Sequence, residues 1–489
     1  MITGAILAGV AGMKVLVLEK EPIIGGRVVS FGGPHGTYSA TEYRDLLAGC
    51  AGLRIVDSEP SLAQIVDGGL FEQHILDGGW HGVSAGDRCR YSTLARYFGK
   101  RIDVDPQVGL LYHRDGDWVE MRDVADRWPK ESVRERTRVA AERALISNAE
   151  AAEFNHVGLR SYLELVTDDE NVRDYYAVLA KFQMGVNDVE RISAGDWIMC
   201  NNMTSASGRH LSLGGGMGDV RSGFKSAVDT FAEVIRESGG EIRTGARVDE
   251  VIIERHRAQG VVVEEAGRRS RVDARFVVSN LPMNRVFRIV PEETFPAELV
   301  ERIKAIFPMP GLLGHVKLRQ PIETRFPKGM FVLDGLEGPK LRGDATVYGF
   351  EQTSIIDPTR QQGADGCLLQ TWVGMSAKDP DEIHDQAVVR EVMDAKFAFM
   401  REQYPGFDDL VEWYIMVAAP AVYGVHPGPG LTGDRRPPVR HPLVRNLFFT
   451  GDTVTQTDVG TNGAAHGAVL CASAVADRDF RVLLPPAMR

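Results

Sequence analysis

The first twenty residues constrain the fold most. Residues 2–11, ITGAILAGVA, have the small and apolar side chains of a buried helix, and Gly12 allows the left-handed turn that ends one. The run KVLVLE at 14–19 follows, and it is typical of a fully buried strand in a parallel sheet. Helix, tight turn, strand and acidic residue in this order form the second half of a βαβ unit that binds a dinucleotide.

A complete unit of this kind begins with a strand and a GxGxxG turn. Neither is found ahead of the helix at 2–11. We therefore expect about a dozen further residues upstream, which supply both features. A partner chain or a rearranged segment that fills the same gap is the alternative.

The α/β pattern returns in the middle and at the end of the chain. A helix with one apolar face is expected over 220–235, and the strands EIRTGARVDEVIIE, GVVVEEA and ARFVVSNLP follow it. The sequence predicts an α/β fold with a Rossmann-like domain formed by 1–90, 208–290 and 426–489. An inserted α+β domain for the substrate is predicted for 91–207 and 291–425.

Composition excludes several classes of function. The formal net charge is −11, so the surface does not favour nucleic acid. No run reaches the roughly 18 apolar residues of a membrane span, and the apolar start lacks the basic flank of a secretion signal. We expect a cytoplasmic protein, with peripheral membrane contact and oligomeric state left open. Its cysteines and its isolated histidines lack metal-ligand spacing, so no metal site is predicted.

Four sequence blocks, in order and spread over the whole chain, carry a family resemblance. They are VLVLEKEPIIGGR, GGGMGDVRSGF with GGEIRTGARVDEV, VVSNLP, and LFFTGDTVTQTDVGTNGAAHGA. Together they resemble the FAD-dependent oxidoreductases of the phytoene desaturase and flavin amine oxidase superfamily, and the phytoene desaturase-like subgroup most. The resemblance implies FAD as the cofactor and an oxidoreductase activity.

The first block predicts the residues at the adenosine and phosphate end of FAD. Glu19 stands at the end of a parallel strand, where its carboxylate can accept both ribose hydroxyls, and Lys20 beside it is included in the site. Gly25 and Gly26 allow the backbone to pass close to the cofactor, and Arg27 offers a planar donor fork. The resemblance places Arg27 at the pyrophosphate.

Three further segments are assigned to the cofactor by the resemblance. It implies that the backbone of Val248 pairs with adenine, and that Asp452, after Gly451, binds the ribityl chain. LDGGWHG resembles the aspartate-glycine turn beside the flavin, which makes Gly79 and His81 candidates.

The last block predicts a helix that begins at the flavin. Free backbone amides and a partial positive charge at its start would stabilise the negative charge of reduced flavin near N1. The residues assigned to this role are Gly460, Thr461, Asn462, Gly463 and Ala464.

Catalytic residues are harder to predict, because the cofactor supplies the chemistry and the protein orients the substrate. The resemblance to amine oxidases implies a lysine on a strand near flavin N5, and GHVKL carries His315 at that point. His315 is therefore a candidate acid or base, since histidine pKa values lie near neutrality. Tyr423 and His426, in AVYGVHPG, are candidates for the wall of the substrate pocket.

We expect hydride transfer between flavin N5 and a C–H bond of an apolar or extended substrate, in the direction of a desaturase or a saturase. A flavin amine oxidase that forms an imine is the alternative enzyme. A flavin-free scaffold or binding protein is the alternative of another class, because the glycine turn is not in the sequence.

Overall fold

The computed structural model describes residues 1–36, 38–50, 52–79, 82–114, 116–186, 188–206, 217–333, 348–363, 365–374, 383 and 385–489. Its helices are α1 (Ile2–Gly9), α2 (Ala40–Gly49), α3 (Leu62–Asp67), α4 (Arg90–Tyr97), α5 (Lys130–Leu145), α6 (Asn148–Glu153), α7 (Leu159–Val166), α8 (Glu170–Met184), α9 (Ala194–Ala206), α10 (Lys225–Glu237), α11 (Ala297–Lys304), α12 (Thr353–Ile356), α13 (Gln386–Gln403), α14 (Phe407–Leu410) and α15 (Gly460–Ala476). Its strands are β1 (Leu16–Leu18), β2 (Ser30–Phe31), β3 (Arg54–Glu59), β4 (Leu76–Asp77), β5 (Val104–Pro106), β6 (Leu110–Arg114), β7 (Asp117–Glu120), β8 (Gly218–Val220), β9 (Glu241–Arg243), β10 (Ala246–Glu254), β11 (Arg257–Glu265), β12 (Arg268–Asp273), β13 (Val277–Ser279), β14 (Met309–Leu318), β15 (Met330–Leu333), β16 (Tyr348–Glu351), β17 (Cys367–Gly374), β18 (Val411–Tyr423) and β19 (Leu447–Phe449).

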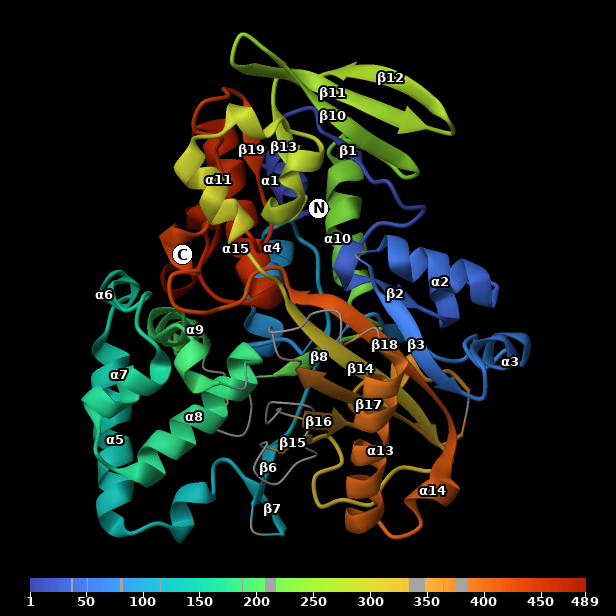
Figure 1. Cartoon of the computed structure of the whole chain (residues 1–489), viewed down its shortest axis with the longest axis vertical. Coiled ribbons are helices and arrows are strands. Elements are labelled where there is room, and N and C mark those ends of the chain that lie inside the picture. Colours follow the sequence, from blue (N-terminus) through green and yellow to red (C-terminus); the bar gives the residue numbers. More distant parts are fainter. Residues whose placement is uncertain are drawn as a thin grey trace.

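The α/β domain is built around α1, α10 and α15 (Figure 1). Apolar side chains of α1, α4, α10 and α15 share one buried cluster. The hydroxyl of Thr3 on α1 lies 2.9 Å from that of Thr450, which directly follows β19. The predicted helix at the start and the predicted small-residue helix near the end therefore pack against each other.

Two parallel strand pairs accompany these helices. β1 pairs with β9, and β13 pairs with β19, as two separate two-stranded sheets. β1 is half-buried, whereas the sequence predicted a fully buried strand. The reason is that β1 has a strand neighbour on only one side within the described chain. The expected upstream strand stays a prediction.

A three-stranded antiparallel sheet, β10–β11–β12, projects from the top of this domain (Figure 1). A bulge between Val248 and Glu250 interrupts the register of β10. The start of β10 is joined to β1, because the amide of Ala246 donates to the carbonyl of Glu19 at 2.8 Å.

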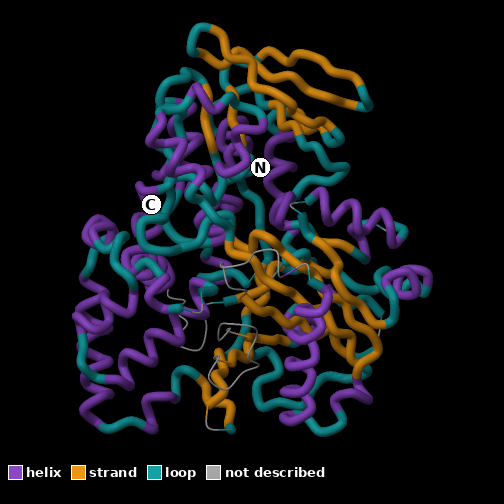
Figure 2. Tube along the Cα trace, viewed as in Figure 1, coloured by secondary structure: helices purple, strands orange, loops and turns teal. Residues whose placement is uncertain are grey.

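The second domain contains an eight-stranded sheet in the order β3-β18-β14-β17-β16-β15-β6-β7. β14 lies between β17 and β18, and all of its residues are buried. Leu312 on one face packs against α13. Leu313 on the other face joins an apolar cluster that includes side chains of α8 and α9. Figure 2 shows the helices gathered beside this sheet.

The structure places some segments differently from the predicted ranges. β3 lies in the range 1–90 but pairs with β18 of the eight-stranded sheet. α4 begins at the border of the range 91–207, yet Tyr91 and Leu94 pack in the core of the α/β domain. β5 and β8 come from the two different ranges and pair with each other. The contacts that decide these placements are long-range, so local sequence patterns do not reveal them.

Among the residues that the structure describes, no helix is both long and apolar enough to cross a membrane.

Candidate active site

The start of α15 has backbone amides that no side chain of the described residues caps. Val459 is the N-cap, no side chain of the described residues caps the helix, and its first turn holds no acidic residue. Gly460, Thr461 and Ala464 are only half-buried. A helix start of this kind binds a negatively charged group, because its amides lack intrahelical acceptors and the helix dipole is positive there.

Arg90 holds the loop that leads into α15. Its guanidinium is 2% exposed and donates to the carbonyl of Thr457 at 3.1 Å and to Asp458 Oδ2 at 3.2 Å. Its backbone amide donates to Asn462 Oδ1 at 3.0 Å. The sequence analysis missed Arg90, because no motif surrounds it and its partners are more than 360 positions away in the chain.

Two of the residues predicted at the helix start, Asn462 and Gly463, stabilise the local structure. The side chain of Asn462 is buried and also donates to the carbonyl of Ser84 at 3.1 Å. A Cβ atom on Gly463 would lie 2.7 Å from the side chain of Gln456 and 2.9 Å from the carbonyl oxygen of Asp458. Only glycine fits at 463, since a side chain would push the preceding loop away.

Arg27 and Asp452 meet, although 425 positions separate them in the sequence. Arg27 Nη2 donates to Asp452 Oδ1 at 2.6 Å, and Nη1 donates to the carbonyl of Ala421 at 3.2 Å. The amide of Gly424 donates to Asp452 Oδ2 at 2.8 Å. Burial alone would raise the pKa of Asp452, but the charge of Arg27 and these hydrogen bonds lower it below its usual value. The first and last sequence blocks therefore form one charged, ionised junction.

Three glycines of these two blocks have positive φ angles. Gly25 and Gly26, before Arg27, have φ of +137° and +59°, and Gly451 has φ of +108°. Such angles are strained for residues with a Cβ atom. They allow both turns to approach the junction closely.

Glu19 lies where β1 ends and β10 begins. Its Oε1 accepts the amide of Glu21 at 3.0 Å, and burial raises the pKa of its carboxyl. Val248 follows Ala246 by two residues on β10, so it lies near the same corner. Lys20 points elsewhere: its ammonium contacts Glu21 and donates to the carbonyl of Gly49 at 2.9 Å. The structure thus brings Glu19 and Val248 together and leaves Lys20 at the surface.

The aspartate-glycine turn follows β4. Gly78 is tightly enclosed, because a Cβ atom there would lie 2.6 Å from Leu53 and 2.8 Å from Val29. Gly79 comes next and is half-buried. His81 lies outside the described residues.

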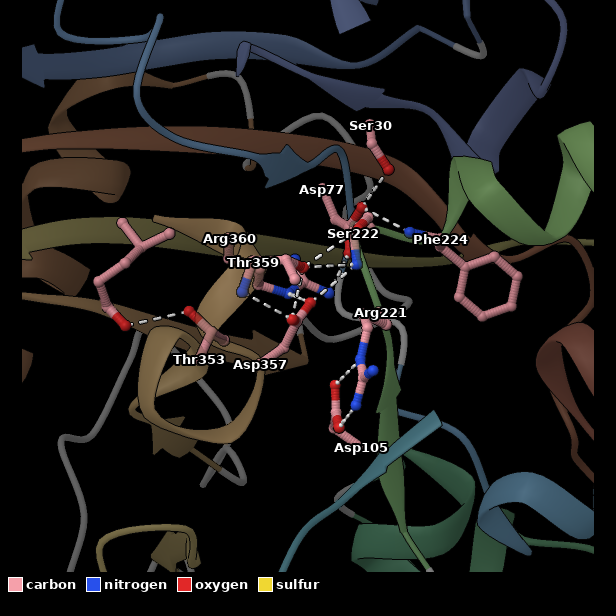
Figure 3. Close-up of polar contacts among 12 residues, drawn as sticks. Ser30, Asp77, Asp105, Arg221, Ser222, Phe224, Thr353, Asp357, Thr359 and Arg360 are labelled. Carbon is pink, nitrogen blue, oxygen red and sulfur yellow. Dashed lines mark hydrogen bonds and ion pairs between the residues drawn. The ribbon is translucent and has the colours of Figure 1, made fainter. Parts of the chain in front are cut away.

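Asp77 anchors this turn (Figure 3). Its carboxylate accepts the hydroxyl of Ser30, the amide of Phe224 at 3.1 Å and Nη2 of Arg360 at 2.8 Å. Both Asp77 and Arg360 are buried, with side chains 2% and 3% exposed. Sequence analysis identified the turn but neither of these anchors, because Arg360 stands in no motif and reaches Asp77 only through the fold.

His315 reaches the same turn from β14. Its Nε2 lies 2.9 Å from the carbonyl oxygen of Asp77, and the side chain is 1% exposed. Burial lowers the pKa of His315 to about 4. The expectation of a pKa near neutrality is therefore wrong, since the apolar surroundings disfavour the charged imidazole.

Tyr423 ends β18 against the start of α15. A Cβ atom on Gly460 would lie 3.2 Å from the Tyr423 ring, so the two are in contact. Burial raises the pKa of Tyr423 well above its usual value, which keeps the phenol protonated. His426 is buried on the other side of this segment with its ring 5.1 Å from that of Phe307, and burial lowers its pKa to about 4.

The α/β fold and the match to a family model together identify a flavin-containing oxidoreductase. Residues 9–476 match the family model for flavin containing amine oxidoreductases, and the chain belongs to this family. A search of curated protein sequences found no match.

Solved structures of the same fold support this assignment. An oxidoreductase from Methanosarcina mazei matches with a TM-score of 0.68 at 15% identity, over 96% of each chain. Putrescine oxidase bound to putrescine matches with a TM-score of 0.61 at 15% identity, over 97% of this chain and 96% of the other. Cyclohexylamine oxidase from Brevibacterium oxydans IH-35A matches with a TM-score of 0.60 at 16% identity, over 97% and 96%.

FAD is the cofactor of this family, and the described residues fit it. The uncapped amides of α15 suit an anionic flavin edge, and Arg27 suits a phosphate. The buried Oε1 of Gln456, beside Gly463, has no hydrogen-bond partner among the described residues. Within the same residues, no group of three His, Cys, Asp or Glu side chains is arranged to hold a metal ion.

Proposed function

We propose that the chain moves hydride between a C–H bond of an apolar or extended substrate and flavin N5, as a desaturase or a saturase. The observation that carries this proposal is the state of His315. It is a buried, neutral imidazole next to the turn that resembles the flavin turn. A neutral imidazole contributes no negative charge of its own to hold an ammonium ion, which supports an uncharged substrate.

The apolar side chains near His315 also support an uncharged substrate. Leu313 precedes His315 on the same face of β14, and its cluster includes Trp413 and Val417 on the adjacent strand. Tyr423 and Val459 pack against this cluster, so it extends to the start of α15.

Each residue has a stated part in the proposed reaction. The flavin, when bound, takes up or returns the hydride. The amides at Gly460 and Thr461 stabilise negative charge at the ring edge, and Tyr423 limits the access of water to it. His315, with a pKa of about 4, is a weak base at neutral pH, so we assign it the role of a hydrogen-bond acceptor that orients the substrate.

An amine oxidase is the second candidate. Putrescine oxidase and cyclohexylamine oxidase share the fold, which is the observation that favours it. A neutral His315 can also accept an N–H of an uncharged amine. The low identity restricts this comparison to the fold, so the substrate has to be tested directly.

Anaerobic bleaching of the flavin separates the two candidates. The FAD-loaded protein is mixed with long-chain unsaturated lipids in one series and with cyclohexylamine and putrescine in another. The proposal predicts that only lipids react with the flavin. In the desaturase direction they bleach the absorbance of oxidised flavin at about 450 nm, and in the saturase direction they restore it after the flavin has been reduced. Bleaching by the amines alone would establish the amine oxidase.

We also keep as proposals a small apolar molecule as the substrate, no nucleic-acid partner, a cytoplasmic location, and peripheral contact with membranes. Binding to lipid vesicles, measured by flotation, tests the last of these.

A further inference from the structure

The contacts of His315 determine which of its nitrogens carries the proton. A carbonyl oxygen can only accept, so Nε2 must donate to the carbonyl of Asp77 at 2.9 Å. Because burial keeps the imidazole neutral, Nδ1 carries a lone pair and no proton. Nδ1 is buried and has no hydrogen-bond partner among the described residues. An unmatched acceptor therefore lies beside the turn.

The direction of the Asp77 carbonyl depends on the Asp77 side chain. Its carboxylate is held from the α/β domain by the amide of Phe224 and the hydroxyl of Ser30, and from the second domain by Arg360. The next amide, that of Gly78, donates to the carbonyl of Val29 at 2.9 Å. With both its side chain and the following peptide fixed, Asp77 has little freedom to turn its own carbonyl.

Arg360 is itself fixed by the segment that follows α12. Its carbonyl accepts the amide of Ile75 at 2.9 Å, one strand position before β4. Its Nε lies 3.5 Å from Asp357 Oδ2, and Asp357 in turn accepts the amide of Ser222 at 2.9 Å. Figure 3 shows these groups converging on one place between the domains. A single guanidinium thus pairs with the carboxylates of both Asp77 and Asp357.

We propose that Asp77 and Arg360 are positioning residues that hold His315 in the Nε2–H tautomer, so that Nδ1 is presented as the acceptor for a donor group of the substrate. Without Arg360, two buried carboxylates would repel each other and the turn would rearrange. The carbonyl would then leave Nε2, and the imidazole would be free to rotate. The part of this inference that concerns the substrate rests on the proposed function, whereas the tautomer does not.

NMR of the FAD-loaded protein with ¹⁵N-labelled histidine tests the tautomer. Comparison with His315→Gln identifies the signals of His315 among those of the 12 histidines. We expect a neutral ring with one slowly exchanging proton on Nε2 and an unprotonated Nδ1. A proton on Nδ1, or a charged ring at pH 7, would overturn the proposal.

Variants then test what holds this state. Arg360→Met and Asp77→Asn are each expected to raise the exchange rate of the Nε2 proton at least about tenfold, because the hydrogen bond to the carbonyl is lost. Arg221→Gln is the matched control: Arg221 lies in the same group but pairs with Asp105 at 2.5 Å and does not contact Asp77. If Arg360→Met or Asp77→Asn fails to fold, Ser30→Ala is used instead. It removes one hydrogen bond to the Asp77 carboxylate and should also raise the exchange rate of the Nε2 proton. An unchanged rate in any folded variant of Asp77, Arg360 or Ser30 would overturn the proposal.

A kinetic measurement separates this inference from the proposed function. With the substrate found by flavin bleaching, Arg360→Met should lower kcat by roughly tenfold or more and leave KM within about twofold, because orientation rather than binding is lost. If no lipid bleaches the oxidised flavin or reoxidises the reduced flavin, the proposed function fails while the NMR result stands. If kcat and KM are unchanged in Arg360→Met, the positioning role fails while the proposed function stands.

Discussion

Arg90 is a buried cation whose partners belong to the loop before α15, to the first turn of α15 or to the end of the chain. Besides Asp458 it reaches the carbonyl of Met488 at 2.9 Å. We expect Arg90→Met to destabilise the fold by about 3–5 kcal/mol, because Asp458 would stay buried without its cation. Urea denaturation measures this. Arg96→Met, an exposed arginine on the same helix, is the control, and equal midpoints for the two variants would contradict the assigned role.

Gly463 is the second residue on which the helix start depends. Gly463→Val is expected to weaken FAD binding at least about tenfold, since the new side chain would collide with Gln456 and displace the amides that face the flavin. Quenching of flavin fluorescence during titration gives the Kd. Ala474→Val, three turns further along α15, should bind FAD as the wild type does. Equal affinity for Gly463→Val would place the flavin elsewhere.

At the scale of elements, helices were predicted better than strand partners. α1, α10 and α15 overlap the ranges in which the apolar spacing or the small-residue run predicts helices. The Gly, Pro, Ser and Thr content of residues 30–70 is typical of loops with one short helix, but this segment contains α2, β3 and α3. The error has a physical cause, because β3 is stabilised by β18, whose paired residues lie more than 350 positions away.

α13 carries a buried lysine that makes the stability depend on pH. Burial lowers the pKa of Lys396 to about 7 from 10.5, and its ammonium donates to Thr371 Oγ1 at 2.9 Å. Between these two pH values the unfolded chain holds a proton that the folded chain has released. The free energy of unfolding therefore rises with pH, with a slope approaching about 1.4 kcal/mol per unit from this group.

Lys396→Met removes the titrating group and keeps most of the apolar stem. We expect the variant to be more stable than the wild type at pH 7, with the difference shrinking toward pH 10. Urea denaturation at a series of pH values measures both. Lys225→Met, at a partly exposed lysine paired with Asp229, should not change the pH dependence. If the free energies of unfolding of Lys396→Met and the wild type differ by the same amount at every pH, the low pKa assigned to Lys396 is contradicted.

At the scale of the whole molecule, the site is assembled from distant segments. Sequence motifs predicted Arg27 and Asp452 separately, and the fold brings them to 2.6 Å. The anchors Arg90 and Arg360 could not be predicted, because a buried arginine is recognised by its partners and these are set by tertiary structure. His315 was predicted as a candidate acid or base because it stands where the resemblance implies a lysine. Its neutral state depends on burial, which the sequence does not show.

The two domains also share the site in unequal ways. The α/β domain supplies the helix start, the Arg27–Asp452 junction and Glu19, which suit the cofactor. The second domain supplies His315 and Arg360, to which we assign the substrate side in our proposal. Binding of FAD should therefore stabilise the α/β domain first, by mass action on its folded state.

The central claim is that Glu19, Arg27, Asp452 and the start of α15 form one FAD site. The most direct measurement is the visible spectrum of the purified 489-residue protein after incubation with FAD and gel filtration. The account predicts a yellow protein that retains about one FAD per chain, and loss of the colour in Gly463→Val. A colourless wild-type protein that does not take up FAD would contradict it.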